Sequence, residues 1–124
     1  MTRWIGRLLM SAAVAHTVIA LVRYQDVVFA IVRAGVFNTV VGDPVKGAVA
    51  WSLLFGGLAF IGGMAVDALE RSSQPVPKSL GWSFVVLGVL GAVLVPASGF
   101  WLLFPAAMGI LRHPKSRSAR PEPE

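Results

Sequence analysis

Long apolar runs constrain the fold of this chain more than any other feature. A membrane-spanning helix needs about 20 mostly apolar residues, because the hydrocarbon core is roughly 30 Å thick and each residue rises about 1.5 Å. One straight helix over residues 80–111 would be about 48 Å long, too long for a single crossing. Pro96 to Gly99 interrupt this run near its middle. The sequence therefore predicts an all-α fold, an integral membrane four-helix bundle within residues 1–112. The predicted spans cover about 4–22, 45–66, 80–95 and 99–112.

Composition agrees with a membrane protein. The chain is 56% hydrophobic before its glycines are counted and 14% charged, whereas soluble domains average about 45–50% apolar with glycine included and about 25% charged. This hydrophobicity excludes an intrinsically disordered chain. The absence of cysteine and the presence of only two histidines exclude a disulfide framework and the usual zinc sites. We expect neither a cofactor nor a metal.

The positive charges predict an orientation. Cytoplasmic loops of membrane proteins are enriched in Lys and Arg. If the N-terminus is cytoplasmic, the outer side holds only Arg23, Arg33 and Lys46. The inner side then holds Arg3, Arg7, Arg71, Lys78, Arg112, Lys115, Arg117 and Arg120. We therefore expect both termini in the cytoplasm and residues 113–124 to form a basic tail. No nucleic-acid motif accompanies the net charge of +5, so anionic lipid headgroups are the expected partner and nucleic acid is not.

The segments between the spans differ in character. Residues 27–41 are too short and interrupted to span, yet too apolar for an aqueous loop. We expect them to form an interfacial or re-entrant segment on the outer side, with Asp26 capping a short helix. Asp43 followed by Pro44 predicts the start of a helix. The polar residues and two prolines from Glu70 to Lys78 predict a water-exposed linker.

Small residues recur at helical spacing along the predicted spans. Helices in lipid associate through close backbone contact at such residues, so we expect these positions to pack the bundle. A homo-oligomer face on the second span is the alternative. Pro105 lies inside the fourth span and predicts a kink. The small residues are Ala12, Ala20, Ala48, Ser52, Gly56, Ala59, Gly63, Gly88, Ala92, Ala106 and Gly109.

Polar groups that converge on the outer half of the bundle form the candidate ligand-binding site. Apart from Arg7 near the cytoplasmic end, His16 is the only strongly polar residue of the first span, and an ionisable residue inside a membrane is a functional hypothesis by default. Structural roles are the alternatives: a histidine bonded to a neighbouring carbonyl, an aspartate that only caps a helix, an arginine that reaches lipid phosphates, and tryptophans in an interfacial belt. The candidate residues are His16, Arg33, Asn38, Asp43, Ser98 and Trp101.

Three classes of function fit these residues. The leading hypothesis is a non-enzymatic inner-membrane protein that binds a lipid-like or small hydrophobic molecule, or a membrane partner. The second is a membrane-embedded enzyme acting on a lipid or isoprenoid-like substrate, with His16 as acid/base assisted by Asp43. The third is an oligomeric small-molecule efflux component. The chain has no nucleophilic cysteine, no Gly-x-Ser-x-Gly motif and no Walker loop.

Four short motifs resemble a known family. They are His16-Thr17, Phe37-Asn38-Thr39, Gly81-Trp82 and Pro96-Ala97-Ser98-Gly99-Phe100-Trp101-Leu102. Together they resemble a bacterial family of small four-span integral membrane proteins classified only as a domain of unknown function. The resemblance covers about residues 3–112. It implies an integral membrane protein of bacterial origin, and it implies no activity, substrate or catalytic residue.

Overall fold

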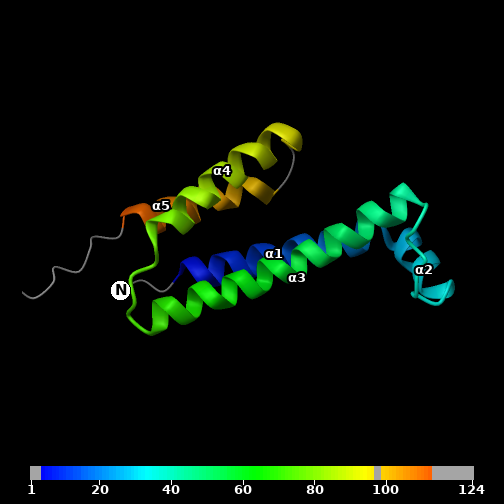
Figure 1. Ribbon diagram of the computed structural model, residues 1–124, viewed down its shortest axis with the longest axis horizontal. Coiled ribbons are helices and arrows are strands. Elements are labelled where there is room, and N and C mark those ends of the chain that lie inside the picture. The colour runs from blue at the N-terminus through cyan, green and yellow to red at the C-terminus, as the bar shows by residue number, and fades with distance from the viewer. Residues whose placement is uncertain (1–3, 97–98, 113–124) are drawn as a thin grey trace, which may run out of the picture.

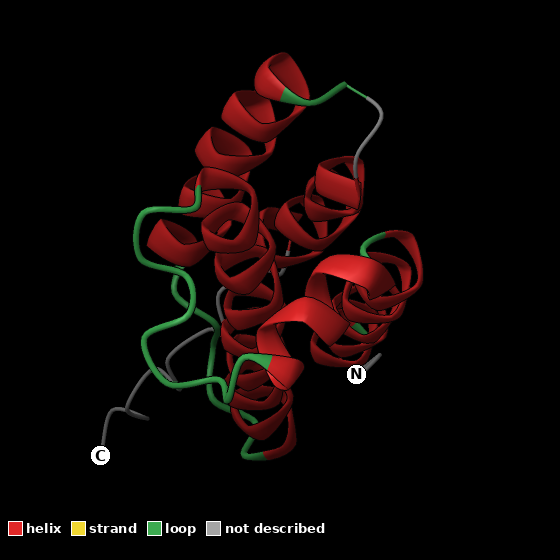
Figure 2. Ribbon diagram, turned by 90° about the vertical axis from the view of Figure 1, so that its right-hand side faces the viewer, coloured by secondary structure: helices red, strands yellow, loops and turns green. Residues whose placement is uncertain are grey.

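The computed structural model describes residues 4–96 and 99–112, and within these ranges the chain is helical without a strand. Figure 2 shows helices joined by loops, which confirms the all-α prediction. The elements in chain order are α1 (Ile5–Arg23), α2 (Gln25–Arg33), α3 (Pro44–Arg71), α4 (Lys78–Leu94), the 3-10 helix η1 (Gly99–Leu102) and α5 (Leu103–Arg112).

Helices α1 and α3 form a long antiparallel pair (Figure 1). Glycines on both helices allow the backbones to touch. A Cβ atom added to Gly63 would lie 2.9 Å from the backbone nitrogen of Met10, and one added to Gly6 would lie 2.6 Å from the Cα of Asp67. One added to Gly56 would collide with the Thr17 hydroxyl. The expected packing role of Gly56 and Gly63 is therefore confirmed.

Helices α4 and α5 form a second hairpin that packs against α1. Gly88 of α4 faces Phe104, and a Cβ atom there would lie 3.3 Å from its ring. The main apolar core lies where α1, α3 and α5 meet. It consists of Ile5, Leu9, Val66, Ala106 and Ile110.

Pro105 does not interrupt a long helix. The 3-10 turn η1 occupies the first part of the predicted fourth span, and α5 begins at Leu103. Pro105 therefore lies in the first turn of α5, where a helix has no backbone partner for the missing N–H group. The predicted kink inside a continuous span is replaced by a boundary between two helical segments.

The segment between α1 and α3 contains the expected short helix, α2. It begins at Gln25, two residues after α1 ends at Arg23, and Asp26 lies in its first turn instead of capping it. Asp43 is the N-cap of α3 and Pro44 is the first helical residue, as predicted. Figure 1 places α2 at the end of the α1–α3 pair far from the N-terminus.

Two helices, α1 and α3, are long and apolar enough to cross a membrane. Only 28% and 22% of their most apolar windows are buried inside the protein. The helix α4 and the segment Gly99–Arg112 are shorter apolar helices. Large apolar side chains on α1, α3 and α4 therefore face outward along most of their length, Trp51, Leu58 and Leu94 among them.

Candidate functional site

His16 forms a hydrogen bond between α1 and α3. Its Nε2 atom lies 3.2 Å from the Ser52 carbonyl oxygen and 3.2 Å from the Ser52 hydroxyl. The Phe55 ring meets the imidazole edge-on, with ring centroids 5.8 Å apart. Within the described residues, Ser52 is the only polar side chain that the structure places on this imidazole. The arrangement joins α1 to α3, and within the described part of the chain it brings no second titratable group to His16.

Asp43 caps α3 at some distance from His16. Its Oδ1 atom accepts hydrogen bonds from the backbone N–H groups of Val45 and Lys46, each at 3.1 Å. The Lys46 ammonium lies 3.3 Å from Oδ2. The backbone hydrogen bond from Lys46 lowers the pKa of the Asp43 carboxyl below its ordinary value of 3.8. Because Asp43 precedes Ser52 by nine residues, about 13 Å of helix separates it from the level of His16.

The remaining predicted site residues are distributed over the surface. Arg33 lies in the last turn of α2, and Asn38 lies in the following loop with φ of 58°; both are exposed. The Trp101 indole N–H donates to the Pro96 carbonyl at 2.8 Å, within its own turn. Ser98 lies outside the described residues. The structure therefore gives Asp43 and Trp101 local partners, and it does not gather these side chains around His16.

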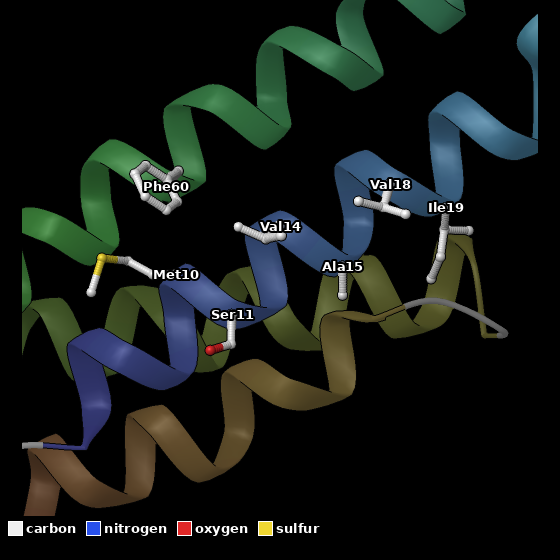
Figure 3. A pocket seen from close by; sticks show the side chains of 7 residues that line it. All are labelled: Met10, Ser11, Val14, Ala15, Val18, Ile19 and Phe60. Carbon is white, nitrogen blue, oxygen red and sulfur yellow. The ribbon is translucent and has the colours of Figure 1, made fainter.

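A shallow open groove runs along α1 and has a volume of about 620 Å³ (Figure 3). Volumes of 300–1,000 Å³ are usual for small-molecule sites. Phe60 is the lining residue that α3 contributes, and the Ser11 hydroxyl is the one side-chain oxygen among the lining residues. Such a surface can hold an apolar chain and offers one hydroxyl for orientation. The groove is lined by Met10, Ser11, Val14, Ala15, Val18, Ile19 and Phe60.

Glu70 ties the end of α3 to the start of α1. Its carboxylate accepts hydrogen bonds from the backbone N–H groups of Ile5, at 3.3 Å, and of Gly6, at 2.9 Å. Trp4, the N-cap residue of α1, provides no side-chain cap. Glu70 therefore caps α1 from a distant part of the chain, at the positive end of the helix dipole. The side chain is 8% exposed, so the prediction that Glu70 belongs to a water-exposed linker is wrong.

Asp67 lies one turn before Glu70, beside Gly6, and is 7% exposed. Its Oδ2 atom accepts a hydrogen bond from the Arg71 Nε at 2.7 Å. Its Oδ1 atom is buried and has no hydrogen-bond partner among the residues that the structure describes. Over residues 4–96 and 99–112, no group of three His, Cys, Asp or Glu side chains is arranged to hold a metal ion.

The groove and the carboxylates lay outside the sequence-based site. The spacing of residues 10, 11, 14, 15, 18 and 19 places them on one helical face, but the same spacing is typical of any lipid-facing stripe. Glu70 and Arg71 precede two prolines and resemble a loop start. Only the approach of α1 to α3 reveals which atoms Glu70 binds.

The chain was compared with known protein families, curated proteins and solved structures. A family model described as a family of unknown function, DUF6463, matches residues 1–117. No curated protein and no solved structure matches the chain.

Proposed function

The chain belongs to this family of unknown function, and we propose that it is a small four-span protein of the bacterial inner membrane that binds a lipid-like molecule. Both termini lie in the cytoplasm, and the spans correspond to α1, α3, α4 and the segment from η1 through α5. The protein is non-enzymatic, and the groove along α1 is where the apolar part of the ligand lies.

The exposure of apolar side chains carries this proposal. A helix from the core of a soluble protein would be mostly buried, but only about a quarter of the residues in the most apolar windows of α1 and α3 are buried. Exposed apolar patches larger than a few hundred square ångströms are rare on soluble monomers. Lipid tails satisfy these faces without further protein. With α1 spanning, Arg23 and Lys46 lie near one end of the pair, and Arg7 and Arg71 near the other.

The groove supports the choice of ligand. Its lining is apolar apart from Ser11, which suits an acyl or isoprenoid chain. Between Met10 and Ile19 the helix rises about 13 Å. An apolar ligand chain that lies parallel to α1 therefore fits along the groove. The enzyme alternative requires a titratable partner for His16, and among the described residues Ser52 is the only polar side chain placed on that imidazole.

Native mass spectrometry of protein extracted with its lipids tests the ligand. Ala15 lines the groove and is exposed, and Ala65 is exposed on α3 outside it. We expect Ala15→Phe to lose a co-purifying lipid-like ligand that both the unmodified protein and Ala65→Phe retain. The same spectra report whether the protein is a monomer or a homo-oligomer. Identical ligand occupancy in both variants would contradict the groove as the binding site.

A further inference from the structure

The loop after α2 presents its apolar side chains outward from a tightly bonded turn. Two hydrogen bonds end α2: the Val36 N–H donates to the Ile31 carbonyl at 3.1 Å, and the Gly35 N–H donates to the Val32 carbonyl at 3.0 Å. Gly35 has φ of 93°. This is the Schellman helix ending, in which a glycine takes the left-handed conformation. The backbone that follows is therefore held in place by the end of the helix.

Val36 is the unusual residue of this turn. Its φ is 67°, and a β-branched residue is a genuine outlier in the left-handed region. Glycine or asparagine would fit the same backbone at lower cost. What valine adds is an apolar side chain, and that side chain is exposed. Phe37, the next residue, is 92% exposed.

The same apolar surface continues onto α2. Val27, Val28 and Ile31 are partly buried, and α2 contacts both α1 and α3. Phe29 and Val32 are more than half exposed. The apolar surface of α2 is therefore wider than the area that α1 and α3 cover. We define the loop tip as Val36 and Phe37, and the outer face of α2 as Phe29 and Val32.

The position of α2 identifies what covers this surface. The helix α1 has 19 residues, which span about 28 Å and match a hydrocarbon core of roughly 30 Å. If α1 crosses the bilayer, as the proposed function requires, Arg23 lies at the boundary and α2 begins two residues later. Exposed Arg33 ends α2, and Lys46 lies in the first turn of α3. These cations mark the headgroup level, and α2 lies at the same end of the α1–α3 pair.

We propose that α2 is a membrane-surface anchor: the helix lies along the outer leaflet, and Val36 and Phe37 insert into its lipids. The occupant of the exposed apolar surface is the bilayer itself, not a soluble protein. The rigid turn keeps the loop tip pointed into the leaflet, so that Phe37 enters lipid while the adjacent Asn38 stays in the aqueous headgroup layer. The segment lies on the membrane and does not re-enter it.

Single-cysteine spin labels test this inference, since the chain has no cysteine of its own. The variants Phe37→Cys, Phe29→Cys, Asn38→Cys and Leu58→Cys carry a nitroxide in lipid vesicles. Accessibility to oxygen, which partitions into lipid, is compared with accessibility to a water-soluble nickel chelate. Leu58 is exposed midway along α3 and is the reference for a spanning helix. We expect Phe37→Cys and Phe29→Cys to show an oxygen-to-nickel ratio several-fold higher than Asn38→Cys and similar to Leu58→Cys.

Two results would overturn the anchor while leaving the spanning helices intact. One is a nickel-accessible Phe37→Cys with an oxygen-accessible Leu58→Cys, which places the loop tip in water. The other is a Phe37→Cys label shielded from both reagents, which indicates a protein contact. The variant Phe29→Cys repeats the measurement outside the turn in case the label at position 37 disturbs it. A nickel-accessible Leu58→Cys would contradict membrane spanning itself, and the anchor with it.

Discussion

Removing the carboxylate of Glu70 should loosen the α1–α3 pair at the end where α1 begins. The change Glu70→Ala deletes the acceptor for the N–H groups of Ile5 and Gly6. Both residues are buried, so water does not readily replace the carboxylate. Hydrogen bonds to a charged group contribute about 1.5–3 kcal/mol each, and loss of an ordinary N-cap costs about 0.5–2 kcal/mol. Because the two bonds share one carboxylate and one is long, we expect a loss of about 2–4 kcal/mol.

Reversible unfolding in mixed detergent micelles, followed by far-UV circular dichroism, measures this loss. Glu70→Gln keeps one carbonyl oxygen as an acceptor and should lose roughly half as much. Asp67→Asn is the matched control, because Asp67 lies one turn away, is equally buried, and has an Oδ1 atom without a partner. Its bond to the largely exposed Arg71 side chain contributes about 0–1 kcal/mol. The capping argument fails if Glu70→Ala unfolds like the unmodified protein, or if Asp67→Asn loses as much.

Three further predictions concern other contacts. Gly6→Ala forces a Cβ atom against the Asp67 backbone and should lower thermal stability. Gly57 has open space around it, so Gly57→Ala should raise stability by about 0.5–1 kcal/mol. Equal effects of the two variants would refute the close approach of α1 to α3. Asp43→Asn keeps an N-cap but removes its acid sensitivity. Since the folded pKa of Asp43 is lowered, its contribution is complete above pH 3.8 and is lost as the pH falls through the lowered value; acid unfolding curves of the two proteins should diverge only in that acid range. His16→Leu should lower the free energy of unfolding by about 0.6–1.7 kcal/mol, the range for hydrogen bonds between membrane helices. It should leave ligand co-purification unchanged. Loss of the ligand from a folded His16→Leu variant would show that His16 belongs to the binding site.

Features encoded by neighbouring residues were predictable from the sequence. Asp43 and Pro44 predict the start of α3 because the capping residue and the first helical residue are adjacent in the chain. Gly56 and Gly63 indicate a contact face because their spacing follows the helix period. Pro96 marks the turn between α4 and η1 for the same local reason.

Features that depend on two distant segments were not predictable. Glu70 was expected to be in a linker because polar residues and prolines follow it, and nothing local shows that the uncapped start of α1 lies 64 residues away in sequence. The predicted site around His16 depends on the assumption that polar groups at one membrane depth converge. This assumption gives the depth of each residue along the bilayer normal. It does not give the face of the helix on which each side chain lies. His16 consequently meets Ser52, whereas Asp43 remains at the end of α3.

Labelling with a membrane-impermeant thiol reagent tests the four-span arrangement most directly. Thr39→Cys reports the segment before α3, and Ser73→Cys reports the linker after it. In spheroplasts, we expect Thr39→Cys to react while the membrane is intact and Ser73→Cys to react only after permeabilisation. Reaction of both cysteines from the same side would show that α3 does not cross the bilayer, and the account would be wrong.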